Sequence, residues 1–433
     1  MKKELNERLT QVGPGTPMGE VFRRFWLPVL LDSELNGPDE EAVPFRILGE
    51  DLVAFRDTEG RLGVLDANCP HRLASLSYGR NEECGLRCIY HGWKFDVDGN
   101  CVDMPSEPNA NQKMKDKIKL TSYPAVERSG ASWIYMGPKN KTPAPPEYEW
   151  ARFPKDRMAA IKRFQPCNYA QALEGGIDSA HISFLHRDFP AAKKSNSGPD
   201  NVHAKFAVGC RNPEFSVNET DYGLQIIAKR ALDDIDDVYY RVTQFMVPSF
   251  QMIPPILVEG RLKTSPVTGN VWVPIDDENT WNWGFSSDVE PLTERQRGVM
   301  GPEGIWGDLD DTYHAHQNAA NRYEFDLERQ RKYNFSGIAG VRNQDAAVVE
   351  SMGPIVDRTK EHLGHSDSGI AMFRRLMLKM ADDLENGKEP EAASQSESFN
   401  IRSVSVILGQ AEDLHDVLPD LAAGEPLKSE AAE

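Results

Sequence analysis

Short runs in which apolar and polar residues alternate, separated by turns, fill the first third of the chain. The turns between the first three runs contain Gly49 and Gly60. Strands this short and this regularly spaced predict a small antiparallel β domain. The runs lie at 44–48, 52–56, 62–66, 93–97 and 132–135.

A segment rich in proline and lysine follows this β pattern. Residues 138–147 read Pro-Lys-Asn-Lys-Thr-Pro-Ala-Pro-Pro-Glu, a composition typical of linkers. We therefore place a domain boundary near residue 150. The expected parts are an N-terminal segment at 1–40, the β domain at 41–150, a second domain at 151–410 and an acidic tail at 411–433.

Beyond the linker, the hydrophobic pattern mixes the two-residue period of strands with the longer period of helices. Strands are predicted at 202–208, 223–231, 238–247 and 279–286. Helices are predicted at 168–186, 308–331, 344–362 and 369–386. The polar segment 385–398 and the acidic tail are expected to be mobile. The fold class that follows is α+β.

Composition and charge narrow the class of protein. Hydrophobic residues make up 39% of the 433 and charged residues 27%, which excludes fibrous and wholly disordered chains. The net charge of −18 argues against nucleic acid as a partner. No run approaches the roughly 20 apolar residues of a membrane helix, and the first residues lack the apolar run of a signal peptide. We therefore expect a cytoplasmic protein that does not bind membranes.

Two cysteines and two histidines form a motif in the β domain. The sequence reads Cys-Pro-His at 69–71 and Cys-Ile-Tyr-His at 88–91, so each half offers one thiolate and one imidazole. A [2Fe–2S] cluster with two Cys on one iron and two His on the other requires this set. A structural zinc site is the main alternative, but it usually pairs Cys with Cys and His with His along the chain. The spacing therefore favours the iron–sulfur cluster.

Such a cluster carries one electron at a time. Imidazole ligands in place of two thiolates raise its reduction potential to between about −150 and +300 mV. It can then accept an electron from a reductase and pass it to a more oxidising centre. Two further cysteines nearby, Cys84 and Cys101, are interpreted as small buried apolar residues.

A second group of metal-ligand residues follows the linker. Asp178, His181 and His186 are spaced by three and five residues, and Gly175 and Gly176 precede them. If the helix loosens near these glycines, the three side chains can point toward one site. Two imidazoles and one carboxylate are the facial triad of non-haem Fe(II) oxygenases.

The carboxylate of this triad has two candidates. Asp178 itself could bind the metal, but its three-residue separation from His181 suits a carboxylate that accepts the ring N–H and fixes the tautomer. The third ligand would then come from elsewhere in the chain. Asp345, at the start of a predicted helix, is our candidate.

Together the two groups resemble the oxygenase component of the Rieske non-haem iron aromatic-ring-hydroxylating oxygenases, and the chain is most similar to their phthalate-dioxygenase-like group. The likeness covers most of the chain, including 18–28 and 350–364. It implies a Rieske domain joined to a catalytic domain of helices packed on an antiparallel sheet. It also implies a homotrimer, possibly stacked into a hexamer, in which the cluster of one chain lies next to the iron of its neighbour.

The resemblance assigns roles to the motif residues. Asp178 would bridge His181 to His91 of the neighbouring chain, which gives electrons a short route. The cluster ligands that it implies are Cys69, His71, Cys88 and His91, and the iron ligands are His181, His186 and Asp345.

The same resemblance implies a terminal oxygenase that hydroxylates an aromatic carboxylate, phthalate-like or a substituted benzoate, with dioxygen as co-substrate. Cis-dihydroxylation in aromatic catabolism is the expected reaction. Electrons would come from NAD(P)H through a separate flavin and iron–sulfur reductase, since the chain has no flavin or nicotinamide motif. The alternatives are a monooxygenase, O-demethylase or aryl-ether-cleaving enzyme on an aromatic acid and, more distantly, a non-catalytic electron carrier or a zinc-stabilised binding protein.

A carboxylate on an aromatic substrate requires a cationic side chain in an apolar pocket. Arg241 lies on a predicted strand with Tyr239 on the same face, and it is the first candidate for this contact. Lys205 and Ser179 are further candidates. Arg230, on the neighbouring strand, is interpreted as a solvent-facing charge.

Overall fold

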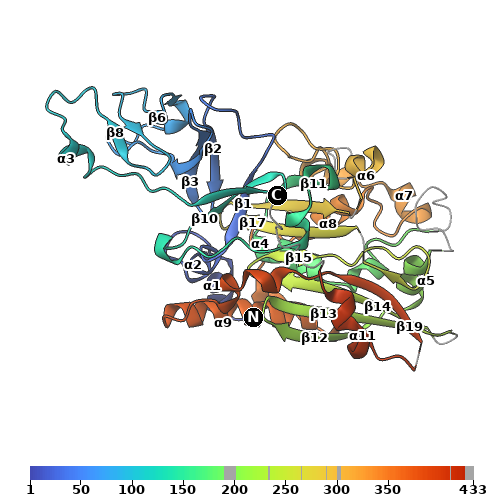
Figure 1. Ribbon diagram of the computed structural model, residues 1–433. Coiled ribbons are helices and arrows are strands. Elements are labelled where there is room, and N and C mark those ends of the chain that lie inside the picture. Colours follow the sequence, from blue (N-terminus) through green and yellow to red (C-terminus); the bar gives the residue numbers. More distant parts are fainter. Residues whose placement is uncertain are drawn as a thin grey trace.

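A small β domain lies to one side of a larger α+β domain (Figure 1). The computed structural model describes residues 1–189, 201–232, 235–264, 266–288, 290–299, 304–409 and 411–424. A three-stranded sheet of order β1-β10-β9 lies where the domains join. Its strands are β1 (Trp26–Leu31), β9 (Ala125–Arg128) and β10 (Ala131–Tyr135).

Two further antiparallel sheets build the β domain. Their strand order follows the chain, as expected for strands joined by short turns. Side chains such as Val53, Leu65 and Phe95 form one core between the sheets. One sheet contains β2 (Val43–Ile47), β3 (Glu50–Arg56) and β4 (Leu62–Asp66), and the other contains β5 (Arg80–Asn81), β6 (Leu86–Arg87), β7 (Lys94–Phe95) and β8 (Cys101–Asp103). The predicted antiparallel β domain is confirmed.

A nine-stranded antiparallel sheet forms the centre of the second domain. Its main path runs β11-β18-β17-β15-β14-β13-β12, while β19 pairs with β14 and β16. The predicted strands at 223–231, 238–247 and 279–286 correspond to β13, β14 and β18. The bounds are β11 (Met158–Gln165), β12 (Glu214–Thr220), β13 (Gly223–Leu232), β14 (Ile235–Met246), β15 (Phe250–Met252), β16 (Leu262–Lys263), β17 (Val267–Pro274), β18 (Thr280–Ser287) and β19 (Val404–Gly409).

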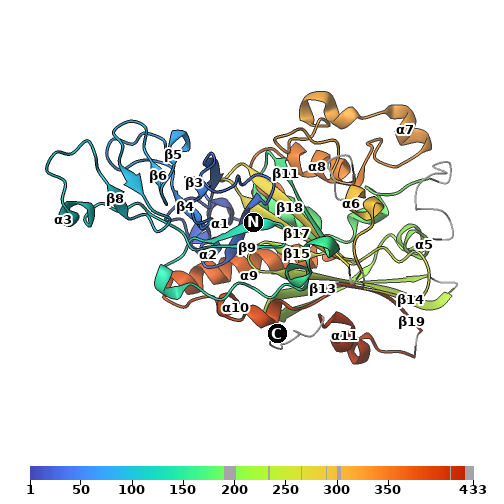
Figure 2. The ribbon, with the colours of Figure 1, turned by 45° about the horizontal axis from the view of Figure 1, so that its top comes forward.

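Helices cover both faces of this sheet (Figure 2). Successive residues of a strand point to opposite faces, and β13 shows this directly. Ile226 lies against Gly369 of α9 (Ser368–Glu385), whereas Ile227 packs with Leu414 of α11 (Leu414–Ala422). The start of the tail that we expected to be mobile thus forms a helix that covers apolar strand residues. Residues 425–433 lie outside the described residues.

One predicted strand is a helix. Residues 202–208 form α5 (Val202–Gly209) because Asn201 caps its first turn, with the side-chain oxygen accepting the backbone N–H of Ala204 at 3.2 Å. A polar residue followed by a short apolar run is compatible with either a strand or a helix. Here the hydrogen bond to the Asn201 side chain favours the helix.

Two predicted helices are shorter than expected. The segment 308–331 is largely irregular before α7 (Leu327–Lys332), because the Asp310 carboxylate accepts backbone N–H groups that a helix would have used. The helix predicted at 344–362 is α8 (Val341–Ser351), which ends before Pro354.

The N-terminal helices lie against α9, so both ends of the chain contribute to the larger domain (Figure 1). Arg8 of the first helix forms an ion pair with Asp382 at 2.7 Å. Within the described ranges, no helix has both the length and the apolar character needed to span a bilayer. The other α-helices of the described residues are α1 (Lys3–Thr10), α2 (Pro17–Phe22), α3 (Gln112–Lys115), α4 (Tyr169–Ile177), α6 (Glu294–Val299) and α10 (Glu391–Ser394).

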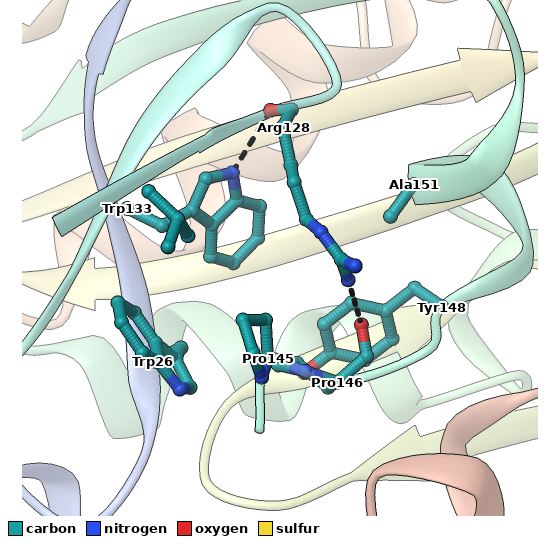
Figure 3. A pocket seen from close by; sticks show the side chains of 8 residues that line it. Trp26, Arg128, Trp133, Pro145, Pro146, Tyr148 and Ala151 are labelled. Atoms are coloured by element: carbon teal, nitrogen blue, oxygen red, sulfur yellow. Dashed lines mark hydrogen bonds between the residues drawn. The ribbon is translucent and has the colours of Figure 1, made fainter. Parts of the chain in front are cut away.

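A small apolar pocket lies at the domain junction (Figure 3). Its lining includes Trp26, Trp133 and Tyr148, and none of the lining residues is His, Cys or acidic. The indole N–H of Trp133 donates to the Arg128 carbonyl at 3.0 Å, and the Arg128 guanidinium donates to the Pro146 carbonyl at 3.2 Å. These contacts fasten the proline-rich linker to the junction sheet, which is a packing role rather than a chemical one.

Candidate active site

Two loops at the tip of the β domain repeat one backbone pattern. The N–H of Leu73 donates to the carbonyl of Cys69 at 2.8 Å, and the N–H of Gly92 donates to the carbonyl of Cys88 at 2.9 Å. Leu73 and Gly92 both have positive φ angles, 60° and 79°, at the position that closes the turn. Each loop thereby holds a cysteine at its start and presents a histidine before it closes.

The two cysteines of these loops are neighbours in the interior. Cys69 and Cys88 are each 2% exposed. Burial raises the pKa of the Cys69 thiol to about 11, and the adjacent Cys88 thiol adds to this effect. Two buried, adjacent thiols lose their protons readily only when a cation takes the place of those protons.

The two histidines of the loops also lie together. The ring centroids of His71 and His91 are 4.4 Å apart, and His71 stacks on Trp93 at 4.4 Å. Nδ1 of His91 is buried and has no hydrogen-bond partner among the described residues. A buried ring nitrogen without a partner costs about 1–3 kcal/mol, which a bond to a metal would offset. The pairs of thiols and imidazoles fit the ligand set of a [2Fe–2S] cluster.

His181, His186 and Asp345 meet at one point in the larger domain. Nε2 of His181 lies 3.0 Å from Nε2 of His186, and Oδ1 of Asp345 lies 3.7 Å from the His181 nitrogen and 3.0 Å from the His186 nitrogen. All three ligand atoms lie within 4.8 Å of one another. Such a convergence of two imidazoles and a carboxylate fits a single metal ion with open positions.

Asp178 lies beside the His181 ring, on the edge opposite to the one that faces Asp345. Its Oδ2 is 3.6 Å from Nδ1 of His181, and its Oδ1 accepts the N–H of Ala180 at 2.6 Å. Burial alone would raise the pKa of Asp178, but the hydrogen bond and charge of His181 hold that pKa below its usual value. Asp178 is therefore ionised beside the nitrogen that points away from Asp345.

Helix α4 (Tyr169–Ile177) delivers this segment to the site. The Asn168 side chain begins the helix by accepting the N–H of Ala170 at 3.0 Å. The helix ends at Ile177 rather than continuing to residue 186 as predicted, because Asp178 leaves the helical conformation. His181 then begins a separate 3₁₀ turn, η5 (His181–Ser183). This break lets both histidines point toward Asp345 of α8.

The two glycines of α4 allow close packing instead of loosening the helix. A Cβ on Gly176 would lie far inside van der Waals contact with the ring of Trp272 on β17. A Cβ on Gly175 would press against Val349 of α8 at 3.1 Å. The helix carrying the histidines can therefore approach both the sheet and the helix carrying Asp345.

A buried ion-pair network fixes the same helix from its other side. Glu174, at 9% side-chain exposure, contacts Arg358 at 3.1 Å and Arg374 of α9 at 2.7 Å. Because both guanidinium groups are buried, removal of the Glu174 carboxylate would leave Arg358 without a counter-ion and Arg374 with Glu361 as its remaining carboxylate.

Helix α8 supplies a further contact that the sequence interpretation missed. Oε1 of Gln344, next to Asp345, lies 2.7 Å from Nδ1 of His186. Residues 186 and 344 come together only in the folded chain, so no local pattern could reveal this pair.

Two buried arginines lie on the sheet face that carries α9. Arg230 of β13 is fully buried and donates to the carbonyl of Ser179 at 2.5 Å, so its interpretation as a solvent-facing charge is wrong. Arg241 of β14 donates to the carbonyl of Pro254 at 3.1 Å. Burial and the charge of Arg241 together lower the pKa of Arg230 to about 10. In the described part of the chain, neither guanidinium meets a carboxylate.

His203 of α5 joins this basic group and was also missed. Its Nδ1 lies 3.2 Å from Nη1 of Arg241. Burial and the charges of Arg241 and Arg230 lower the pKa of His203 well below its usual value, so the ring is neutral. Of the other predicted substrate contacts, Ser179 is buried beside Arg230, whereas Lys205 is exposed on α5.

Family models match both halves of the chain. The model described as Rieske [2Fe-2S] domain matches residues 25–124, and the model described as LigXa C-terminal domain like matches residues 134–417. The phthalate 4,5-dioxygenase oxygenase subunit of Pseudomonas putida is 43% identical over 383 residues, which cover 87% of this chain and 85% of that protein. The chain belongs to the Rieske non-haem iron oxygenases.

Other Rieske oxygenases are similar over comparable lengths. The 3-chlorobenzoate-3,4-dioxygenase oxygenase subunit of Comamonas testosteroni is 35% identical, with 91% of this chain and 92% of that protein covered. The 5,5'-dehydrodivanillate O-demethylase oxygenase subunit of Sphingobium sp. is 32% identical, with 92% and 85% covered. The crystal structure of dicamba monooxygenase bound to dicamba shares the fold, with a TM-score of 0.58, 20% identity, and 84% of this chain and 99% of that chain covered.

The family fixes the cofactors and the type of enzyme. The chain is the oxygenase component of a Rieske oxygenase, which uses a [2Fe–2S] cluster, a mononuclear non-haem iron and dioxygen. Oxygenase components of this kind receive electrons from a separate protein and work as oligomers. The two groups of donor atoms described above fit these two cofactors.

Proposed function

We propose that this oxygenase hydroxylates an aromatic carboxylate, phthalate-like or a substituted benzoate. The observation that carries the proposal is the pair of buried guanidinium groups, Arg230 and Arg241, without a carboxylate partner in the described part of the chain. A buried cation without a counter-ion is costly, and an anionic substrate would supply that counter-ion. The names of two relatives, phthalate and chlorobenzoate dioxygenase subunits, agree with such a substrate.

In this proposal the tip loops and the larger domain each hold one cofactor. The proposed cluster ligands are Cys69, His71, Cys88 and His91, and the proposed iron ligands are His181, His186 and Asp345. When bound, the cluster relays single electrons and the iron activates dioxygen next to the substrate.

The side chains around the iron ligands have separate tasks. Arg241 binds a substrate carboxylate and so fixes which ring carbon faces the iron site. Arg230 donates to Ser179 and holds the segment that follows Asp178. Asp178 lies 3.6 Å from Nδ1 of His181, favours a proton on that nitrogen and so leaves the Nε2 lone pair of the ring for the proposed iron site.

A homotrimer would join the two kinds of site across a subunit boundary. Large apolar side chains are exposed around the tip loops, among them Leu73 at 73% and Ile89 at 61%. A second exposed apolar group, which includes Phe184, Phe335 and Val348, surrounds η5 and α8. One chain's tip placed on the η5 and α8 surface of its neighbour would bury both groups and bring His91 toward Asp178. Sedimentation should give the mass of a trimer, or twice that mass if trimers stack.

Electron supply requires a partner. A separate flavin and iron–sulfur reductase would deliver electrons from NAD(P)H to the cluster, and a cytoplasmic location remains a prediction. The match of the catalytic-domain model to residues 134–417 argues against a pure electron carrier, in which that segment would be idle.

One observation favours a second reaction on the same kind of substrate. A relative of 32% identity over most of the chain is named an O-demethylase subunit. Transfer of one oxygen atom to the methyl carbon of a methoxybenzoate would release that carbon as formaldehyde and leave a phenol, with the second oxygen atom reduced to water and the same carboxylate contact at Arg241. The substrate atom that lies nearest the iron decides between the two reactions.

A single turnover distinguishes these reactions without any reductase. Chemically reduced protein is mixed with isotope-labelled dioxygen and a panel of phthalates, benzoates, methoxybenzoates and uncharged aromatic compounds, and mass spectrometry counts the labelled atoms in each product. Two labelled atoms in a dihydrodiol acid indicate dihydroxylation, whereas an unlabelled phenolic acid together with one labelled atom in trapped formaldehyde indicates O-demethylation. Labelled products only from uncharged aromatic compounds would refute the aromatic carboxylate.

The role of Arg241 has a matched control. Arg241→Met should raise the KM for the aromatic acid by about 10- to 100-fold, because a hydrogen bond between charged groups contributes about 1.5–3 kcal/mol. Lys205→Met removes the same charge from an exposed position and should change KM by less than about twofold. The reverse ranking would assign the carboxylate contact to Lys205.

A further inference from the structure

The amide of Gln344 has only one orientation that satisfies its surroundings. Its Nε2 lies 2.9 Å from the carbonyl oxygen of Ile338, and its Oε1 lies 2.7 Å from Nδ1 of His186. A flipped amide would place Oε1 against the Ile338 carbonyl, where two acceptors would face each other. The amide nitrogen therefore faces Ile338, and the amide oxygen faces His186.

This orientation decides the tautomer of His186. An amide oxygen can only accept a hydrogen bond, so Nδ1 of His186 must carry the proton. In the neutral ring, the lone pair is then on Nε2, which faces Oδ1 of Asp345 and Nε2 of His181 at 3.0 Å each. If His181 is also neutral, with its proton on the Nδ1 that faces Asp178, three electron pairs point at one another, an arrangement that a bound metal ion stabilises.

Ile338, whose carbonyl accepts from Gln344, lies in a segment that is hydrogen-bonded to the backbone next to His186. The Ile338 carbonyl also accepts from the side chain of Asn334 at 2.8 Å. Asn334 and Ile338 lie in the segment 333–338. This segment pairs with the backbone that follows His186, since the Phe335 N–H donates to the Arg187 carbonyl at 2.9 Å. The segment 333–338 thus holds both the ring of His186, through Gln344, and the backbone next to that ring.

We propose that Gln344 is a positioning residue for metal binding, which holds His186 in the Nδ1-protonated tautomer and sets its distance from the adjacent Asp345. This inference rests on the proposed iron site. Asp178 has the corresponding task for His181, so one ring is oriented by a charged carboxylate and the other by a neutral amide. Helix α8 supplies both a ligand, Asp345, and the group that orients another ligand.

The test measures metal binding rather than turnover. Protein with an oxidised cluster and an emptied iron site is titrated with Co²⁺, and the low-temperature EPR signal of Co²⁺ gives the affinity, since the oxidised cluster has no EPR signal. Gln344→Leu, which removes the acceptor, should weaken Co²⁺ binding by about 10- to 100-fold, the usual loss when a group that orients a metal ligand is removed. Unchanged affinity in this variant would overturn the proposal.

Two further variants separate positioning from a purely structural role. Gln344→Glu keeps the acceptor for His186 but loses the donor to Ile338, so the fold should be less stable while Co²⁺ affinity stays at or above the native value. Gln171→Leu alters another buried glutamine, which bonds the carbonyls of Val349 and Gly353 without touching a ligand, and should leave the affinity within about threefold of native. If affinity instead follows the thermal stability of all three variants, Gln344 has only a structural role.

His186→Ala shows which hypothesis fails. Loss of Co²⁺ binding in this variant with native binding in Gln344→Leu would overturn the role of Gln344 alone. Native binding in His186→Ala would remove the proposed iron site itself. The visible spectrum of the cluster, unchanged in every variant, confirms that the β domain is intact.

Discussion

The two groups of candidate metal-ligand residues are built by different means. At the tip of the β domain, all four donors lie within residues 69–91, and backbone hydrogen bonds inside each loop define their positions. In the larger domain, the donors extend from His181 to Asp345, and side chains from distant segments hold them in place. The first site is specified locally, whereas the second depends on the packing of the whole domain. The two sites should therefore respond differently to mutation.

The largest expected effect is the loss of function of one candidate site while the other site stays intact. His91→Ala should abolish the visible absorption and labile sulfide of the cluster, and turnover should fall to background, while iron still binds at the other site. His181→Ala should abolish turnover but leave the cluster spectrum intact. Visible spectroscopy and metal analysis check both variants. A native cluster spectrum in His91→Ala would show that this ring is not a ligand.

A loss of stability confined to the larger domain is the next largest effect. Glu174→Leu leaves Arg358 buried without a carboxylate and Arg374 with Glu361 alone, which should lower the free energy of unfolding by about 3–5 kcal/mol. Urea unfolding followed by tryptophan fluorescence measures this loss, and cluster absorption reports on the β domain separately. Asp51→Asn, which breaks the exposed pair with Arg46, should cost less than about 1 kcal/mol. Equal losses in the two variants would contradict the buried network.

A smaller effect tests the close approach of α4 to the sheet. Gly176→Ala inserts a methyl group against Trp272, and overpacking of this kind should cost about 1–3 kcal/mol and displace the segment that carries His181. Gly13→Ala is the matched control, because a Cβ there meets nothing within 4 Å. Thermal unfolding and iron content measure both variants. If Gly176→Ala keeps native stability and iron content, the close approach has no structural importance.

The smallest effect decides between the two candidate carboxylates. Asp178→Asn replaces a charge-assisted hydrogen bond to His181 with a neutral one, a difference of about 1 kcal/mol, so electron transfer from the cluster should slow about five- to tenfold with both metals bound. Stopped-flow measurement of cluster oxidation with substrate and dioxygen checks the rate. An empty iron site in Asp178→Asn would make Asp178 a ligand in place of Asp345.

The candidate site in the β domain could be proposed from the sequence, because the residues that define it lie close together in the chain. A cysteine, a histidine and the residue that closes the turn lie within five positions in each loop, and the chemistry of Cys69, His71, Cys88 and His91 restricts the cofactor without any knowledge of the fold. The same holds for β4, which precedes the first loop, and β7, which follows the second, whereas the two-residue strands β5 and β6 were not predicted.

Prediction of the second site was incomplete, because its contacts join distant residues. Asp345 was named from the start of its helix and from family resemblance, but nothing near Gln344 marks it as a partner of His186. His203 was missed because an apolar run after Asn201 fits a strand as well as a helix. Arg230 was wrongly interpreted as solvent-facing. Its side of β13, the face that carries α9, is covered by segments distant in the sequence, which only the folded domain brings there.

The repeated loops at the tip have a consequence for how the cluster is assembled and lost. Each loop contributes one thiol and one imidazole, and in a Rieske cluster the two thiolates bind one iron and the two imidazoles bind the other. With the proposed ligands, opening either loop would therefore weaken both irons at once, and neither iron could remain fully coordinated alone. Cluster loss should be an all-or-none event, without a stable half-occupied intermediate.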